Sequence, residues 1–430
     1  MPSLAKPNLK LNLGRRSGAD IVGLDIQPGH IAAVQARVNG SIVVKHAAGA
    51  PLPADIVREG EVLDEGVLAE TLRELFKDGS LDRRVRLGVA NQRTVLRTLE
   101  MPPVTDHKEL DAAVRFLAQD QVPMPLSNAV LDYHSLGVSD TPEGPRQRVV
   151  LVAAQRDMIE RLLAATRDAG LRPEGIDLSA FALIRSLYRP DPEHEGRVLY
   201  LNVDGLTNMA IAEGTICRFT RVVGGGIEAM ASELAERRSI PLVEARALIA
   251  AVDLTAPVLS EQIIAPVAEA LPEVPLLDEV VPDEVAPDGD ALESESDQAA
   301  REQTMSYAEM TTVSPAAVSA EAPTAVTQTT ADADVRTVLE SGIREIAGEM
   351  RNSLDFHRSQ EGGGEVSLVV LSGSALELPG FADALQEQLG VEVRSESVHL
   401  DQDNPDESLG GVSAHRLAIA AGLAVEEAPR

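Results

Sequence analysis

The sequence predicts an α/β protein made of two related halves. A small α+β module is expected inside the first half, and a disordered acidic insertion inside the second. Strand-like runs and helical periodicities alternate over residues 21–100, and the same style returns over 176–250. Each stretch contains a strand that leads into an acid and a turn, at Asp25 and at Asp204. The 430 residues are enough for two to four domains of about 100–200 residues each.

The first half is expected over residues 19–100 and 176–197. Its strands are predicted from the runs "IVGLDI", "IAAVQA", "SIVVKH", "VRLGVA" and "TVLRTLE", which are rich in β-branched and other apolar residues. A helix is predicted between the third and fourth runs, because apolar residues share one helical face: Val67, Leu68, Leu72, Leu75 and Phe76. The segments "GIDLS" and "AFALIRSL" add a strand and a helix to this half.

The inserted module is expected over residues 101–175. Its first helix lies between prolines and carries one apolar face, formed by Leu110, Ala113, Val114 and Leu117. Two strands, "AVLDYHSLGV" and "QRVVLVAAQ", flank a polar turn, and a second helix follows them and ends at a glycine. The order helix, strand, strand, helix suits a small layered α+β unit.

The second half is expected over residues 198–250 and 336–430. Three strand-like runs, "RVLYLNVD", "TNMAIA" and "TICRFT", precede a glycine turn that opens a helix. After the insertion, a long helix is predicted from the apolar stripe of Leu339, Ile343, Ile346, Met350 and Leu354. A strand, a tight turn, a helix, another strand and a closing helix complete this half.

Two segments are expected to lie outside the folded halves. Residues 251–335 are predicted to be a disordered acidic insertion, because their Pro-rich, acidic composition buries too little apolar surface to offset the ordering entropy. Residues 1–18 are predicted to be a flexible basic tail, in which basic residues alternate loosely with leucines. An alternative for this tail is contact with an acidic partner or anionic lipid. The residues concerned are Lys6, Lys10, Arg15 and Arg16, with Leu9, Leu11 and Leu13.

Composition excludes several functions. The net charge of −30 and the scarcity of aromatic residues argue against nucleic-acid binding, which needs Lys, Arg and exposed rings. Cys217 is the only cysteine, so a disulfide within the chain and a cysteine metal cluster are excluded, and a buried apolar role is expected for it. No apolar run reaches the ~18 residues of a membrane span, and the N-terminus lacks a signal-peptide core. A cytoplasmic protein is therefore expected.

Several motifs carry a family resemblance. The recurring "GLDIQPG" and "LNVDGLT" turns, with the late turn "VVLSGSALELPG", resemble the actin/Hsp70/sugar-kinase superfamily. In that superfamily, two α/β halves clamp a nucleotide, and two hairpin turns hold its phosphates. Within it, the chain is similar to the PilM proteins of type IV pilus assembly, through "RTLEMPPVTDHKELDAAVRFLAQDQVPMPLSNAVLDYHSLG", "VVLVAAQRDMIERLLAATRDAGLRPEGIDLSAFALIRSL", "CRFTRVVGGG" and "LSGSALELPGFADALQEQLGVEV". The similarity covers nearly the whole chain except the insertion and the N-terminal tail.

The resemblance implies a role, partners and a cofactor. It implies a cytoplasmic component of the pilus inner-membrane complex that binds the cytoplasmic tail of a PilN-like membrane protein. It also implies contact with pilus motor or platform components, at the cytoplasmic face of the membrane, and a site for ATP and Mg²⁺. The positions that match the family's nucleotide motifs are Asp25, Gln27, Gly29 and His30 in the first turn, Asp204, Gly205 and Thr207 in the second, Gly225 in the glycine turn, Glu244 in the next helix, and Gly373 and Ser374 in the late turn.

Every one of these motifs departs from the family pattern. Gln27 stands where the family has glycine, Pro28 lacks a backbone N–H, and Ala32 replaces a lysine that would meet phosphate. In the second turn the motif's acid aligns with Asn202, or with Asp204 if the turn is shifted by two residues. Compensating cations could come from Arg218, Arg221 or Arg246. Without a ligand, Asp25 would be a strand-end acid capping a turn, and Gly224–Gly226 a helix-entry turn.

These departures favour a non-enzymatic scaffold with a degenerate nucleotide site, and residues 101–175 as the platform for the partner's tail. Three alternatives stay open: an ATP-binding or ATP-hydrolysing protein of the same machinery, an FtsA-like polymerising membrane tether, and a GspL-like scaffold. An FtsA-like tether would need an apolar, basic C-terminal helix, whereas the chain ends in the acidic "AVEEAPR". A GspL-like relative usually continues into a membrane span.

Overall fold

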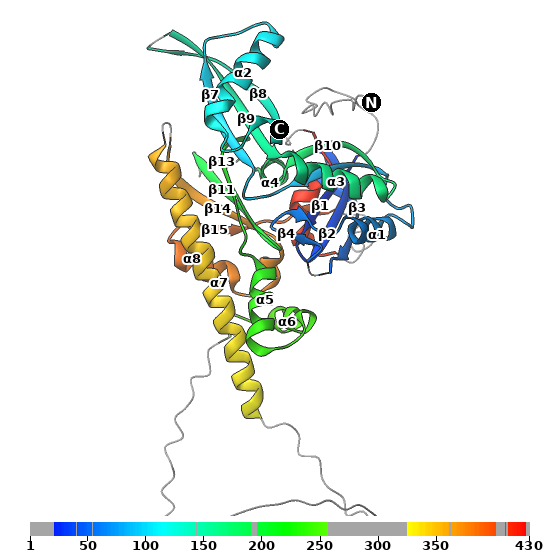
Figure 1. Ribbon diagram of the computed structural model, residues 1–430. Coiled ribbons are helices and arrows are strands. Elements are labelled where there is room, and N and C mark those ends of the chain that lie inside the picture. Colours follow the sequence, from blue (N-terminus) through cyan, green and yellow to red (C-terminus); the bar gives the residue numbers. More distant parts are fainter. Residues whose placement is uncertain are drawn as a thin grey trace, which may run out of the picture. The chain divides into compact units, whose positions relative to one another are not determined.

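The computed structural model describes residues 21–39, 41–53, 55–142, 144–190, 196–256, 325–360, 363–400, 409 and 412–426. Two sheets organise this part of the chain (Figure 1). The first sheet contains, in spatial order, β10 (Arg172–Leu178), β6 (Arg84–Val89), β1 (Val22–Gln27), β2 (His30–Asn39), β3 (Ser41–Pro51) and β16 (His399–Leu400). The second contains β13 (Ile216–Val223), β12 (Thr207–Glu213), β11 (Arg197–Val203), β14 (Val366–Ser372) and β15 (Glu392–Ser395).

The two sheets repeat one topology. In the first, β1, β2 and β3 form an antiparallel meander, β6 pairs parallel to β1, and β10 pairs parallel to β6. In the second, β11, β12 and β13 form the meander, and β14 and β15 extend it as parallel strands. The predicted pair of related α/β halves is confirmed, since strand order and direction agree over five strands in each sheet.

Amphipathic helices cover the outer face of each sheet. On the first sheet, α1 (Glu65–Leu75) and α3 (Arg156–Asp168) bury their apolar faces in one core, and Asp64 caps α1 by accepting a hydrogen bond from the backbone N of Val67 at 3.0 Å. The second sheet is covered by α5 (Ile227–Arg238), α6 (Leu242–Ala250), α7 (Ala325–Ser359) and α8 (Phe381–Leu389). The predicted stripe of α7 is confirmed, because Leu339, Ile343, Ile346, Met350 and Leu354 are all buried.

A central layer of two helices joins the sheets. It consists of α4 (Ser179–Leu187) and α10 (Ala418–Leu423), whose side chains share one core with residues of both sheets. The two helices approach closely where Gly422 faces the backbone of Ala182: a Cβ at Gly422 would lie 1.9 Å from the carbonyl oxygen of Ala182. Arg86 donates hydrogen bonds to the carbonyl oxygens of Leu423 and Val425 at 3.0 and 2.8 Å, which satisfies the end of α10.

The inserted module has its own sheet and core. The sheet has the order β7 (Val95–Met101), β9 (Gly144–Gln155) and β8 (Ala129–Thr141), and α2 (His107–Gln121) packs on it. A 3₁₀ turn (Leu126–Asn128) leads into β8. A short hairpin, β4 (Val57–Arg58) and β5 (Glu61–Val62), lies outside the three sheets.

The structure differs from three of the expected domain ranges. The module begins at β7 and ends at β9, so it spans 95–155 and not 101–175, because β7 pairs with β9 while α3 and β10 pack on the first sheet. Residues 336–430 do not all belong to the second half, since β16 pairs with β3, and the C-terminal helices η3 (Ala414–Leu417) and α10 contact the first sheet. Helix α7 begins at Ala325, inside the segment predicted to be disordered.

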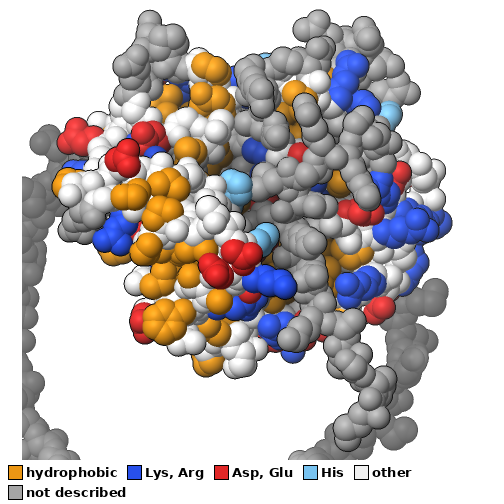
Figure 2. Space-filling view, turned by 90° about the horizontal axis from the view of Figure 1, so that it is seen from above, with side chains coloured by type: hydrophobic (Ala, Val, Ile, Leu, Met, Phe, Trp, Pro, Cys, Tyr) orange, Lys and Arg blue, Asp and Glu red, His pale blue; other side chains and the backbone are white. Residues whose placement is uncertain are grey.

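Other sequence predictions concern the surface and the termini. Residues 1–18 and most of 251–335 lie outside the described residues. Cys217 is buried on β13 as expected, and burial raises the pKa of its thiol to about 12. None of the described helices combines the length and hydropathy needed to cross a membrane. Basic and acidic side chains intermix on the face shown in Figure 2. Part of the acidic excess of the chain comes from residues 251–335, which contain 18 of the 68 acidic residues but one of the 38 basic residues.

Candidate functional site

The turns of two hairpins, one from each sheet, are in direct contact. The β1–β2 turn contains Pro28 and Gly29, and the β11–β12 turn contains Gly205. A Cβ at Gly205 would lie 2.2 Å from the carbonyl oxygen of Pro28, so only a residue without a side chain permits this approach. Gly29 has φ +86°, in the region that favours glycine, and a Cβ there would lie 2.7 Å from Glu228 Oε2. The two backbones therefore close the gap between the turns.

Gln27 links the two hairpins from inside. Its Nε2 donates a hydrogen bond to Asp25 Oδ2 at 2.8 Å, and its Oε1 accepts one from the backbone N of Leu206 at 3.3 Å. Asp25 is 3% and Gln27 2% exposed. Burial raises the pKa of Asp25 to about 7, the hydrogen bond from Gln27 opposes this, and the charge of Asp204 adds to it. The glutamine that replaces the family's glycine thus occupies the interior between the turns.

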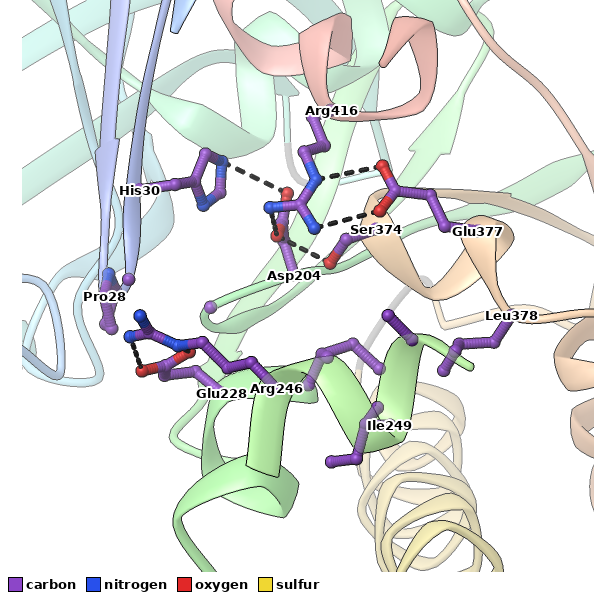
Figure 3. Close-up of a pocket in the computed structure, with 14 residues that line it drawn as sticks. Pro28, His30, Asp204, Glu228, Arg246, Ile249, Ser374, Glu377, Leu378 and Arg416 are labelled. Carbon is purple, nitrogen blue, oxygen red and sulfur yellow. Dashed lines mark hydrogen bonds and ion pairs between the residues drawn. The ribbon is translucent and has the colours of Figure 1, made fainter. Parts of the chain in front are cut away.

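A cavity of about 110 Å³ lies beside this contact (Figure 3). Ligand pockets for small molecules usually measure roughly 300–1,000 Å³, so this cavity is small. It is lined by residues of both halves and of the C-terminal segment: Pro28, Gly29, His30, Asp204, Gly205, Ile227, Glu228, Arg246, Ile249, Ala250, Ser374, Glu377, Leu378 and Arg416.

Asp204 is the central acid of the cavity. Its Oδ1 accepts a hydrogen bond from Ser374 Oγ at 2.7 Å, and its Oδ2 lies 3.4 Å from His30 Nε2 (Figure 3). The His30 contact is too poorly aligned to be a hydrogen bond, since Nε2 has no hydrogen-bond partner among the described residues. Burial lowers the pKa of His30, and the charge of Asp204 opposes that shift. Burial therefore disfavours the charged form of His30.

Both guanidinium groups at the cavity are already engaged by carboxylates. Arg416 donates from Nε and Nη2 to the two oxygens of Glu377, each at 2.9 Å. Arg246 on α6 makes a two-pronged pair with Glu228 on α5, with 2.9 Å between Arg246 Nε and Glu228 Oε2. Figure 3 shows these pairs on opposite sides of the cavity, with Asp204 near the Arg416 pair. Each bidentate pair uses two of the five N–H donors of its guanidinium group and balances its charge, which weakens the arginine as a phosphate ligand.

Some of the predicted site residues line the cavity and others do not. Five of the eleven line it: Gly29, His30, Asp204, Gly205 and Ser374. Asp25 and Gln27 are buried behind the turns, and Gly373 packs its backbone on Val203 of the second hairpin. Thr207 donates its hydroxyl to the carbonyl oxygen of Gly225, so these two bind each other. Glu244 is exposed on α6, away from the cavity lining.

Sequence reasoning missed three of the charged residues that line the cavity. Glu228, Glu377 and Arg416 lie far apart in the sequence. Glu377 falls within the late turn "VVLSGSALELPG", and Glu228 lies two residues after the glycine turn, but no local pattern marks any of the three as a site residue. Of the three arginines considered as compensating cations, Arg246 lines the cavity, whereas Arg218 pairs with Glu213 and Arg221 with Glu349. Only the packing of α5, α6 and the C-terminal segment assembles this charged rim.

A complex of nucleotide and Mg²⁺ does not fit this arrangement. Phosphates need amide and cationic donors in the space between the turns. That space is closed by the contact of Gly205 with Pro28, and Gln27 takes up the N–H of Leu206. No group of three or more His, Cys, Asp or Glu among the described residues could hold a metal ion.

Comparisons with known proteins identify the family to which this fold is similar. A family model described as "Type IV pilus assembly protein PilM" matches residues 23–264. A solved "PilM-PilN type IV pilus biogenesis complex" superposes with a TM-score of 0.65 at 22% identity, covering 94% of this chain and 98% of that one. The ethanolamine utilization protein EutJ from Carboxydothermus hydrogenoformans matches with a TM-score of 0.46 at 13% identity, covering 96% and 94%, respectively.

MreB5 of Spiroplasma citri, bound to AMPPNP, matches with a TM-score of 0.43 at 10% identity, covering 95% of each chain. Scores this low, for EutJ and MreB5, add nothing to the assignment. The family match spans more than half of the chain, and the two related halves with an inserted module form the predicted actin-like fold. The chain belongs to the PilM family of type IV pilus assembly proteins.

Proposed function

We propose that this chain is an adaptor of the type IV pilus assembly machinery that binds the cytoplasmic tail of a PilN-like membrane protein. Membership of the PilM family supports the assembly role, and the matched solved structure is a complex with PilN. Binding that tail would hold the chain at the cytoplasmic face of the membrane and link the membrane complex to motor or platform components. The closed contact between Gly205 and Pro28 favours an adaptor over an ATPase.

The inserted module offers a docking place for the tail. An apolar pocket of about 50 Å³, here called the module pocket, lies where the module meets the first sheet and α4. It is lined by Val89, Val130, Asp132, Val152, Ala154, Ile159, Ile176, Asp177, Leu178 and Phe181. Among the described strands, β8 and β10 each pair along one edge only, and both contribute to the lining. The pocket has room for part of one side chain, so an extended peptide would dock along these strand edges and over the partly exposed apolar lining.

A charge in the module pocket should block binding of the tail. In Val130→Lys, the half-buried Val130 on β8 receives an ammonium group at the apolar lining. We expect the affinity for a synthetic PilN-like tail to fall at least about tenfold in a calorimetric titration, because burying a charge is costly. The matched control is Val138→Lys on the same strand, where the side chain is 57% exposed and outside the pocket. Equal affinity of both variants and the parent chain would move the docking place elsewhere.

Nucleotide should leave the thermal unfolding midpoint of the chain almost unchanged. Because the turns are closed, we expect 1 mM ATP with Mg²⁺ to shift the unfolding midpoint by less than about 1 °C. A ligand bound with a Kd of 10 μM would add about 2.7 kcal/mol at this concentration and raise the midpoint by several degrees. A rise of that size that disappears in Asp25→Ala would favour the alternative, an ATP-binding or ATP-hydrolysing protein. The tail titration in the presence and absence of ATP is the companion measurement.

A further inference from the structure

The module pocket has a candidate occupant within the chain itself. We propose that residues 9–13 of the N-terminal segment dock in this pocket and compete with the partner's tail. The inference rests on the proposed function in one respect, namely that the tail uses the same pocket. Its other part, docking of the chain's own segment, stands on the residues of the pocket and of the segment alone.

The sequence of the segment matches the pocket in period and in charge. Leu9, Leu11 and Leu13 alternate with polar residues, so an extended chain presents all three leucines on one face. The pocket offers partly exposed apolar side chains to such a face: Val130, Val152, Ile176 and Phe181.

The two charged residues that line the pocket, Asp132 and Asp177, are both acidic. Asp177 pairs with Arg185, and its Oδ1 accepts a hydrogen bond from the backbone N of Leu178 at 2.8 Å. The segment 1–20 carries four basic residues and one acidic residue in a chain of net charge −30. Arg185 balances the charge of Asp177, so Asp132 is the acidic lining residue that favours approach of the basic segment.

The register of the first sheet shows that the segment can reach the pocket. Val22 pairs with Val85 on β6, and Val85 pairs with Pro173 on β10. The pocket lies at Leu178, which pairs with Val89, four residues further along β6. Two strand spacings of about 4.8 Å and four residues of about 3.3 Å give a separation of roughly 16 Å. Residues 14–20 span up to about 23–25 Å when extended, so Leu13 reaches the pocket without strain.

Competition within one chain follows from tethering. A segment joined to its site by a short linker acts at an effective concentration on the order of 1 mM. If the free segment binds with a Kd of about 0.1 mM, the tethered segment lowers the apparent affinity of the chain for the partner's tail about tenfold. The pocket would then be shielded until a partner of higher affinity displaces the segment.

The test uses the full chain and changes only the segment. In the triple variant Leu9→Ser/Leu11→Ser/Leu13→Ser, we expect the affinity for the PilN-like tail to rise about tenfold. The matched control, Asn8→Ser/Asn12→Ser, keeps the leucines and should behave like the parent chain. A synthetic peptide of residues 1–20 should bind the triple variant with a Kd of about 0.1 mM. The same peptide should not bind when Val130→Lys is added to that variant.

The outcomes separate this inference from the proposed function. If the peptide of residues 1–20 binds the triple variant but the PilN-like tail does not, the segment docks and the proposed partner is wrong. If the tail binds parent and triple variant equally and the peptide does not bind, the proposed function stands and this inference is overturned. Light scattering over about 10–200 μM should report a monomer. A concentration-dependent dimer that the triple variant abolishes would assign the segment to a second copy and overturn docking within one chain.

Discussion

Replacing Gly422 by alanine is expected to lower the free energy of unfolding by at least about 3 kcal/mol. The new Cβ would lie 1.9 Å from the carbonyl oxygen and 2.5 Å from the carbonyl carbon of Ala182, where α10 meets α4. These are backbone atoms, so no side chain can swing aside, and the two helices must separate. Overpacking usually costs 1–3 kcal/mol. The cost should be at the upper end or above it here, because both sheets share the core around these helices. Urea unfolding followed by circular dichroism measures the change.

A glycine without close neighbours serves as the control. Gly348 lies on α7, and a Cβ there would meet no atom within 4 Å. Gly348→Ala should therefore stabilise the protein by about 0.5–1 kcal/mol, because alanine favours the helix and restricts the unfolded chain. A loss of less than about 1 kcal/mol in Gly422→Ala would show that α4 and α10 can move apart freely, and that this layer does not hold the halves together.

Replacing Asp25 by asparagine is expected to stabilise the protein above pH 7 by about 2–4 kcal/mol. Burial raises the pKa of Asp25 from 3.8 to about 7, so the folded chain holds a proton that the unfolded chain has lost. Between these two values, stability falls as pH rises, by up to 1.4 kcal/mol per pH unit. Below pH 3.8 the carboxyl group is neutral in both states and the penalty is absent. Asparagine stays neutral throughout and keeps an oxygen that accepts from Gln27, now 2.8 Å from Asp25 Oδ2.

The measurement is the free energy of unfolding of both proteins at pH 4, 6 and 8. Their difference should be small at pH 4 and largest at pH 8. Asp78→Asn is the control, because Asp78 is exposed and backbone and side-chain hydrogen bonds from Ser80 lower its pKa, so its substitution should bring no gain at high pH. An Asp25→Asn variant that is less stable than the parent at pH 8 would mean that the fold stabilises the charged carboxylate and does not raise its pKa. That result would also revive the case for a bound cation at the hairpins.

Local pattern predicted the elements better than their grouping. The apolar stripe of α7 and the helical face around Leu68 and Leu72 are buried as predicted. The module's boundary was misplaced because "TVLRTLE" is a strand by any local criterion, and only pairing decides which sheet it joins. The same holds for β16, whose two residues carry no signal of their own but pair with Val43 and Val44.

The candidate site divides in the same way. The motifs located the two turns and the acids Asp25 and Asp204, since each follows from residues a few positions apart. The pairs of Glu228 with Arg246 and of Glu377 with Arg416 could not be anticipated, because each joins side chains brought together by separate helices and loops. The sequence also left open whether Gln27 weakens ligand binding or fills the site, because that depends on the distance between the two hairpins.

By itself, the sequence determined the two α/β halves, the inserted module and the family, because periodicity and short motifs encode local structure and ancestry. The tertiary structure alone decided the module's true boundaries, the helix layer around Gly422 and the state of the hairpin contact. These depend on which surfaces meet, and that outcome is set by packing between residues that are distant in the sequence. The closed contact of Gly205 with Pro28 is the clearest case. A Cβ at Gly205 would lie 2.2 Å from the carbonyl oxygen of Pro28, and the sequence around these two residues does not predict so close an approach.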